Sequence, residues 1–243
     1  MEKAEKFHNE VVTMQVDAGL YLIATPIGNT NDITPRALHV LIRVDAVACE
    51  DTRVTGGLFK HFSIKQSLFP YHEHNEKVMA ITIADRIAAG DAIALVCDAG
   101  TPGINDPGFR VVRECRRRKL PVTIIPGPSA PAAAVAASGL PSDAFLYLGF
   151  PPGRSVARRC LFEKYRDFPH TLIFLESCHR IQKCIGDIVE IFGEERTVAV
   201  VRELTKLHET WHVGSAKSVC EELYAVNARG EYTLIIAAAD FTL

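Results

Sequence analysis

The stretch of sequence that decides the fold is residues 92–108, which read AIALVCDAGTPGINDPG. The first six residues are apolar and predict a buried strand, and the next eleven contain three glycines and two prolines. Glycine and proline impose an unusual backbone path and leave main-chain N–H groups unshielded, which suits a polar ligand at the carboxyl end of a strand. Taken alone, the same composition also describes an ordinary tight turn.

Two further apolar runs end in turns of this kind. Residues 21–29 read YLIATPIGN, and residues 122–129 read VTIIPGPS. Thr34-Pro35 then predicts the start of one helix, and Ser129 is placed to cap an alanine-rich helix. Because the carboxyl ends of parallel strands meet at one edge of an open α/β sheet, three such turns predict a single ligand site. The chain lacks both the P-loop pattern and the usual dinucleotide fingerprint, so neither common phosphate cradle is expected.

Strand and helix patterns alternate along the rest of the chain, which predicts an α/β protein. Further elements are expected as helices at 78–89, 109–118, 179–192 and 216–224, and as strands at 145–149, 171–175, 198–202 and 232–238. Proline, glycine and alanine cluster at 126–141 and suggest a boundary there. We therefore expect a loose N-terminal tail at 1–17 and two domains, at 18–130 and 131–243.

Composition is consistent with a cytoplasmic protein. The chain has 243 residues, of which 48% are apolar, and contains no run of the roughly eighteen apolar residues that a membrane span needs. The charged N-terminus has no apolar signal segment, and the seven cysteines include no Cys-x-x-Cys pair, so reduced core thiols are expected. His72-Glu73-His74 lacks nearby third and fourth ligands, so no metal site is predicted.

Eight segments, taken in order, resemble a known family. The chain looks like the bacterial small-subunit (16S) ribosomal RNA cytidine 2′-O-methyltransferases of the tetrapyrrole methylase superfamily, from about Gly19 to Ile236. The segments are 24–29 (ATPIGN), 49–53 (CEDTR), 74–76 (HNE), 98–108, 126–129 (PGPS), 139–143 (GLPSD), 176–180 (ESCHR) and 202–206 (RELTK).

This resemblance implies an α/β fold of two domains with a cofactor cleft between them, S-adenosyl-L-methionine as cofactor, and a homodimer. It implies 16S ribosomal RNA or the small ribosomal subunit as partner, with no membrane and no metal. Family members often continue past the last strand with a small helical extension, whereas this sequence ends at Leu243. The cofactor-binding residues implied are Pro26, Asp98, Ala99, Gly100, Asn105, Ser129, Ala130, Leu175, Leu204 and Leu234.

Glu203 and Lys206 are the candidate catalytic residues, because they are polar groups at the end of a predicted buried strand. A ribose 2′-hydroxyl is a poor nucleophile while protonated, so a base or a positive charge near it would help. A surface ion pair at the strand end is the alternative interpretation of the same two residues.

Net charge is only −2, so contacts with RNA phosphates are expected in local clusters. Arg154, Arg158 and Arg159 follow a proline- and glycine-rich stretch and are the favoured cluster, with Arg53 and Glu76 as further substrate-binding candidates. Surface charge is the alternative for each. Two other functions remain open on the same fold, namely a precorrin-type methylase and a non-catalytic ribosome-assembly factor.

Overall fold

The computed structural model describes residues 15–226 and 228–243, so most of the expected 1–17 tail lies outside the described residues. The chain divides into two compact units, with unit 1 ending at Ser129 and unit 2 beginning at Ala130. Each unit is built on its own five-stranded sheet.

Unit 1 contains a parallel sheet in the order β3-β2-β4-β1-β5. The central strands β1 and β4 are buried at every residue, as expected for strands that are covered on both faces. The strands are β1 (Gly19–Ile23), β2 (Ala46–Cys49), β3 (Leu68–Pro70), β4 (Ala92–Val96) and β5 (Val122–Ile125).

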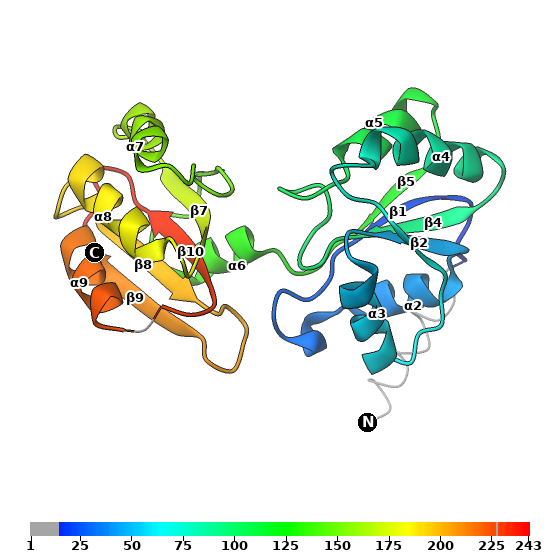
Figure 1. Cartoon of the computed structure of the whole chain (residues 1–243), viewed down its shortest axis with the longest axis horizontal. Helices are drawn as coiled ribbons and strands as arrows, with labels where there is room; N and C mark the ends of the chain where they lie inside the picture. Colours follow the sequence, from blue (N-terminus) through cyan, green and yellow to red (C-terminus); the bar gives the residue numbers. More distant parts are fainter. Residues whose placement is uncertain (1–14, 227) are drawn as a thin grey trace. The chain divides into compact units, whose positions relative to one another are not determined.

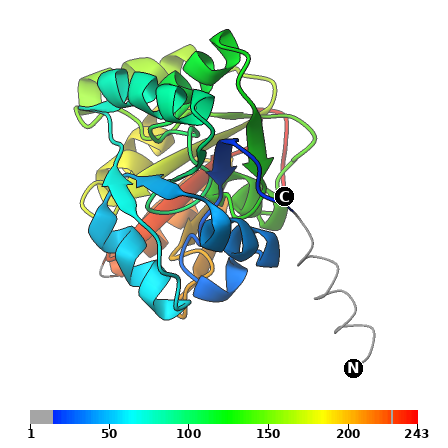
Figure 2. The same cartoon turned by 90° about the vertical axis from the view of Figure 1, so that its right-hand side faces the viewer.

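Helices cover both faces of this sheet. Helices α2 and α3 pack on one face, and α4 and α5 pack on the other (Figure 1). Figure 2 shows the same two layers from the side, with the blue to cyan helices below the sheet and the teal to green helices above it. The helices are α2 (Pro35–Arg43), α3 (Thr52–His61), α4 (Glu76–Ala88) and α5 (Phe109–Arg117), with a short 3-10 turn η1 (Thr30–Asp32) before α2.

The start of α2 follows the sequence rule that predicted it. The Thr34 side chain accepts a hydrogen bond from the Ala37 N–H at 3.1 Å, and Pro35 occupies the first helical position. Ala37, Val40 and Leu41 then lie on one buried face of the helix. The predicted cap and the predicted first residue are both confirmed.

Unit 2 contains a mixed sheet in the order β6-β7-β10-β8-β9. Only β6 and β7 are parallel, and the other neighbours are antiparallel. The strands are β6 (Phe145–Tyr147), β7 (Thr171–Ser177), β8 (Thr197–Arg202), β9 (Thr210–Ser215) and β10 (Glu231–Ile236).

One face of this second sheet packs against α6, and the other packs against α7, α8 and α9 (Figure 1). Strand β7 extends two residues beyond the predicted 171–175, so Glu176 belongs to the strand and is buried. The helices are α6 (Ala130–Ala137), α7 (Ser155–Lys164), α8 (Ile181–Phe192) and α9 (Ala216–Ala225). Among the described residues, none of the helices is long and apolar enough to cross a membrane.

Candidate functional site

The three predicted turns meet at the carboxyl edge of the unit 1 sheet. Thr25 and Gly100 exchange two backbone hydrogen bonds, of 2.8 and 3.1 Å, which join the turn after β1 to the turn after β4. The Thr25 hydroxyl donates to the Cys97 carbonyl at 3.1 Å, and the Thr101 hydroxyl donates to the Pro128 carbonyl at 3.1 Å. The turn after β5 is therefore tied to the other two, and the expected convergence is present.

At this edge, two neighbouring strands are followed by helices on opposite faces of the sheet. Strands β1 and β4 are neighbours, but α2 leaves β1 on one face and α5 leaves β4 on the other. The chain after β1 therefore leads to the face that carries α2 and α3, and the chain after β4 leads to the face that carries α4 and α5. In open α/β sheets, ligands bind in the space that opens at such a switch point.

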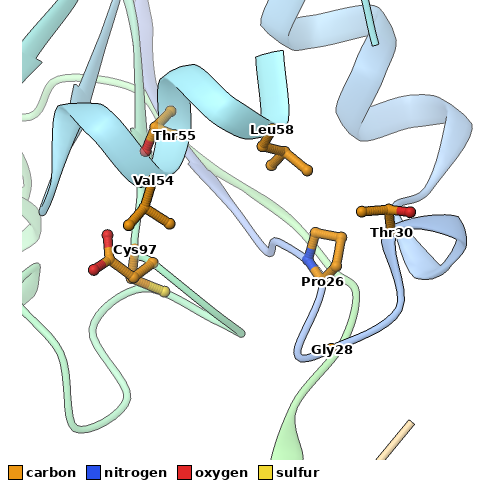
Figure 3. A pocket seen from close by; sticks show the side chains of 8 residues that line it. Pro26, Gly28, Thr30, Val54, Thr55, Leu58 and Cys97 are labelled. Carbon is orange, nitrogen blue, oxygen red and sulfur yellow. The ribbon is translucent and has the colours of Figure 1, made fainter. Parts of the chain in front are cut away.

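A pocket lies at this edge of the sheet, between the loop after β1, helix α3 and the start of the loop after β4 (Figure 3). Val54 and Leu58 lie on the side of α3 that faces the loop carrying Pro26. The walls are mainly apolar, with two hydroxyls and one carboxylate among them, a composition suited to a small organic ligand with a few polar groups. The lining residues are Pro26, Gly28, Thr30, Val54, Thr55, Leu58, Cys97 and Asp98.

Carboxylates gather beside the pocket. Asp98 accepts a hydrogen bond from the Asp51 N–H at 3.1 Å, and burial followed by the Asp51 charge raises the pKa of Asp98. Burial, reinforced by Asp106 and Asp98, likewise raises the pKa of Glu50. This negative rim favours a ligand that carries positive charge. Among residues 15–226 and 228–243, no group of three or more histidine, cysteine, aspartate or glutamate side chains could hold a metal ion.

Cys97 is not a nucleophile in this pocket. It is 2% exposed, and burial, helped by the nearby Asp106 carboxylate, raises the pKa of its thiol far above neutrality. Because the thiolate is the reactive form of cysteine, Cys97 acts as an apolar wall.

The predicted residues of unit 1 fall at three places. Pro26 and Asp98 line the pocket, and Gly100, with a φ of +89°, forms the bridge to Thr25. Ala99 and Asn105 belong to the same loop after β4, and Ser129 ends the unit directly before Ala130 and α6.

Arg53 and Glu76, the two other candidates of unit 1, each take part in an ion pair. The Arg53 guanidinium is 89% exposed and lies 2.6 Å from the Asp51 carboxylate. Hydrogen bonds from Arg53 lower the pKa of Asp51 to about 2. Glu76 accepts a hydrogen bond from Arg110 at 2.6 Å. Arg53 therefore stays accessible to a substrate, whereas Glu76 is largely engaged within the protein.

The candidate catalytic pair of unit 2 lies in a hairpin loop, residues 203–209, that joins β8 to β9 (Figure 1). The Lys206 amine donates to Glu203 Oε1 and to Glu231 Oε2, both at 2.9 Å. Burial lowers the pKa of Lys206, but its hydrogen bonds to the two carboxylates outweigh this and raise it overall. Burial raises the pKa of Glu203, but hydrogen bonds from the Lys206 amine and the Glu231 N–H outweigh burial and lower the pKa overall. Both side chains are therefore charged near neutral pH.

The three leucines assigned to the cofactor have different surroundings. Leu204 is partly buried and packs against the core on the α6 side, and Leu175 is partly buried near the end of β7. Leu234 is 1% exposed and lies in the core beneath α8 and α9. Its side chain is enclosed by the unit itself, so we do not carry Leu234 into the proposed site.

The three arginines of the predicted RNA-binding cluster in unit 2 differ in exposure and in ion pairing. Arg158 is 2% exposed, and its guanidinium forms an ion pair with Asp187, with nitrogen–oxygen distances of 2.5 and 2.7 Å. Arg159 also pairs with Asp187, at 2.8 Å, and with Glu190. This arrangement corrects the expectation for Arg158, because a buried and neutralised guanidinium is not offered to an RNA phosphate. Arg154 directly precedes α7 and is exposed.

The sequence reasoning missed several residues that the structure brings to these places. In unit 1 the α3 wall of the pocket, Val54, Thr55 and Leu58, follows the CEDTR segment and carried no signal beyond its position. In unit 2 Glu231 lies 25 residues from Lys206 and meets it through the pairing of β10 with β8. Only the tertiary contacts reveal these residues.

Comparisons with known proteins agree with this geometry. Residues 19–220 match the family model of the tetrapyrrole (corrin/porphyrin) methylases. The fold is similar to crystal structures of the methyltransferase CobJ, with a TM-score of 0.68 at 16% identity over 93% of this chain and 96% of that one. It is also similar to uroporphyrin-III-C-methyltransferase from Thermus thermophilus, with a TM-score of 0.64 at 19% identity over 91% of this chain and 95% of that one. At such identities the structural likeness shows the fold alone.

The fold and the family match define a class, and the chain belongs to the tetrapyrrole methylase family. Within that class it is similar to proteins named Ribosomal RNA small subunit methyltransferase I. It is 51% identical over 193 residues to the one from Escherichia coli O157:H7, covering 79% of this chain and 68% of that protein. It is 43% identical over 228 residues to the one from Xylella fastidiosa, covering 93% of this chain and 84% of that protein.

Proposed function

We propose that this chain methylates the ribose 2′-hydroxyl of a cytidine in 16S ribosomal RNA, with S-adenosyl-L-methionine as methyl donor, in the cytoplasm. The observation that carries the proposal is its 51% and 43% identity, over most of the chain, to the relatives named Ribosomal RNA small subunit methyltransferase I. The structurally similar enzymes that act on tetrapyrrole precursors are far more distant in sequence, so they favour the fold and not their own substrate.

The unit 1 pocket fits the methyl donor by its chemistry. Pro26, Val54 and Leu58 supply apolar walls for an aromatic base, and the Asp98 carboxylate at the rim suits a ligand with a positively charged sulfur and amino group. The left-handed Gly100 turns the loop after β4 at the edge of the pocket, while its own N–H donates to the Thr25 carbonyl. Leu175 and Leu204 stay cofactor-binding candidates on the family resemblance alone.

When bound, S-adenosylmethionine supplies a methyl group whose bond to sulfur breaks as the new bond to the ribose oxygen forms. Because this leaving group is already activated, the protein mainly has to bind the donor and align it with the ribose hydroxyl. Neither Lys206 nor Glu203 has to generate an activated donor.

Lys206 is the better of the two catalytic candidates. It is charged near neutral pH and held between two carboxylates, so it can stabilise negative charge that develops on the ribose oxygen. The pKa of Glu203 is lowered, so its carboxylate is a weak general base. It accepts a hydrogen bond from the Lys206 amine and so helps to position that amine. The hydroxyl proton then leaves to solvent as the carbon–oxygen bond forms.

Contacts with the RNA backbone are assigned to the accessible arginines. Arg154 and Arg53 are exposed, and Arg159 is 43% exposed although paired. We retain these three as phosphate contacts and Glu76 as an orienting residue, and we assign Arg158 to structure.

The proposal includes a homodimer, which rests on the family resemblance. Static light scattering at micromolar protein should give a particle of about twice the 26.7 kDa chain mass. A particle of the single-chain mass across the concentration range contradicts the dimer and leaves the chemistry untouched.

The decisive experiment incubates the protein with small ribosomal subunits, and separately with naked 16S RNA, in the presence of isotopically labelled S-adenosylmethionine. The RNA is digested to nucleosides, which are identified by mass spectrometry. Labelled 2′-O-methylcytidine is the expected product, and Lys206→Met should lower kcat strongly with little change in donor affinity. Glu194 lies before β8, whereas the hairpin loop follows that strand, so Glu194→Gln provides the control. Label in a base, or none in RNA, refutes the proposal.

A further inference from the structure

The hairpin loop 203–209 has a backbone that the sequence alone does not favour. Glu203 has a φ of +54° and Thr205 a φ of +66°, both in the left-handed region. Such values are uncommon outside glycine, and a β-branched residue such as Thr205 is a clear outlier. Strained conformations of this kind persist only where surrounding contacts enforce them, and they concentrate at functional sites.

One side of the loop is held through Glu203. Its backbone N–H donates to the Glu231 carbonyl at 2.9 Å, and its carboxylate accepts from the Glu231 N–H at 3.0 Å. The same carboxylate oxygen accepts from the Lys206 amine. The left-handed Glu203 is therefore fixed to β10.

The other side of the loop is held by Glu209. One of its carboxylate oxygens accepts from the Thr205 backbone N–H at 2.7 Å, and the other accepts from the Trp211 indole N–H at 2.9 Å. Trp211 lies on β9 opposite Val201 of β8 and packs against the core on the α6 side. Glu209 thus joins the strained residue to an indole that is itself anchored in the sheet.

Thr205 also carries a polar group that the loop leaves unused. Its hydroxyl oxygen is buried and has no hydrogen-bond partner. A buried hydroxyl without a partner costs free energy, so a loop selected for stability alone would not be expected to keep one. Together with the two left-handed residues, it indicates that the loop conformation serves the neighbouring Lys206.

We propose that Glu209 is a positioning residue for the methyl transfer: it clamps the Thr205 N–H and the Trp211 indole and thereby fixes where Lys206 lies. This inference rests on the proposed function, since it assigns to Glu209 the placement of the candidate catalytic amine. Glu209 has no role in binding or activating the donor. Its side chain acts on Lys206 through the Thr205 backbone, and its own N–H also donates to the Lys206 carbonyl at 3.1 Å.

The experiment compares wild type with Glu209→Ala, Glu209→Gln and the control Glu194→Gln. Alanine removes both acceptors, and glutamine keeps one oxygen and so can serve only one of the two donors. Glu194 is an exposed carboxylate of the same unit that accepts from Lys217 at 2.8 Å, so its change to glutamine removes a comparable charge elsewhere.

Three readouts are measured: kcat and KM for methyl transfer to the small ribosomal subunit, donor affinity by calorimetry, and tryptophan emission. The emission reports on this loop directly, because Trp211 is the single tryptophan of the chain. We expect Glu209→Ala to lower kcat by about 10- to 100-fold, the scale of loss for a displacement of roughly 1 Å at a reacting group. Its KM and donor affinity should stay near the wild-type values, and its emission maximum should shift.

Glu209→Gln should lie between alanine and wild type in both kcat and emission, and Glu194→Gln should match wild type. If Glu209→Ala does not fold, the glutamine variant decides alone. A variant that has a shifted emission but wild-type kcat overturns the positioning role, and unchanged emission overturns the clamp itself. If the wild-type protein transfers no methyl group to RNA, the proposed function itself is wrong. If the wild type is active and the Glu209 variants are equally active, only the positioning role of Glu209 is wrong.

Discussion

The variant Arg158→Met tests whether Arg158 stabilises the fold or binds RNA. Methionine keeps an apolar side chain of similar length but removes the charge and every hydrogen-bond donor. Arg158 is 2% exposed, and its partner Asp187 is 5% exposed. The change therefore leaves a buried carboxylate without its closest cation.

The expected cost follows from the contacts of Asp187. Breaking a buried ion pair by removing one partner destabilises a protein by about 3–5 kcal/mol. Asp187 keeps the Ser155 hydroxyl at 3.0 Å and Arg159 at 2.8 Å, which compensate part of the lost charge. We therefore expect about 3 kcal/mol, which corresponds to a melting temperature lower by roughly 10–20 °C for a unit of this size.

Urea and thermal denaturation, followed by circular dichroism, measure this loss, and RNA binding is measured on the same variant well below its melting temperature. The matched variant is Arg154→Ala, four residues away on the exposed side. Arg154→Ala should leave stability within about 0.5 kcal/mol and reduce the slope of log affinity against log salt by about one unit. Arg158→Met should keep the wild-type slope.

The opposite pattern would refute this reasoning. If Arg158→Met melts like wild type while its salt slope falls by one unit, Arg158 contacts a phosphate and its pairing with Asp187 contributes nothing to stability. Loss of both stability and slope would mean that Arg158 holds the segment from which Arg154 is presented.

Three further perturbations test other parts of the structure. Burial raises the pKa of Asp187, but hydrogen bonds from its arginine and serine partners outweigh burial and lower the pKa overall. The charged Asp187 therefore contributes its full stabilisation of the fold above the ordinary carboxyl pKa of about 4, and this contribution is lost as pH falls below it. The urea midpoint should therefore decline more steeply below that pH in wild type than in Asp187→Asn, and equal declines contradict the shift. Gly230→Ala places a Cβ against the Glu203 carboxylate at a φ of +88°, so it should displace that carboxylate and lower kcat. A wild-type kcat would show that the position of the Glu203 carboxylate does not matter for turnover. Gly100→Val puts a β-branched residue at a φ of +89°, and calorimetry should show loss of S-adenosylmethionine binding by a protein that circular dichroism shows to be folded, whereas unchanged affinity would place the donor elsewhere.

Several regular elements with strong patterns could be predicted, but β2, which is buried at all four residues, was missed, as were helices α3 and α7. Strands β1 and β4 are continuous apolar runs, and α8 carries one apolar face, so their sequences indicate their structure. Strand β9 was missed because it is an edge strand whose residues are half-buried or exposed, which leaves no alternation to detect. Strand β3 has three residues and no fully buried position, and it too carries no pattern of its own.

The sequence by itself determined where the glycine and proline turns fall, that they follow strands, and which segments match the family. These are local properties, because a turn depends on the residues that form it and a parallel sheet brings strand ends together. Only the tertiary structure decided which charges are free. Arg154 and Arg158 look equivalent in sequence, but Asp187, 29 residues beyond Arg158, neutralises one of them in the core. Glu209 gained its role in the same way, since a carboxylate becomes a clamp only when folding brings its two donors within hydrogen-bonding distance.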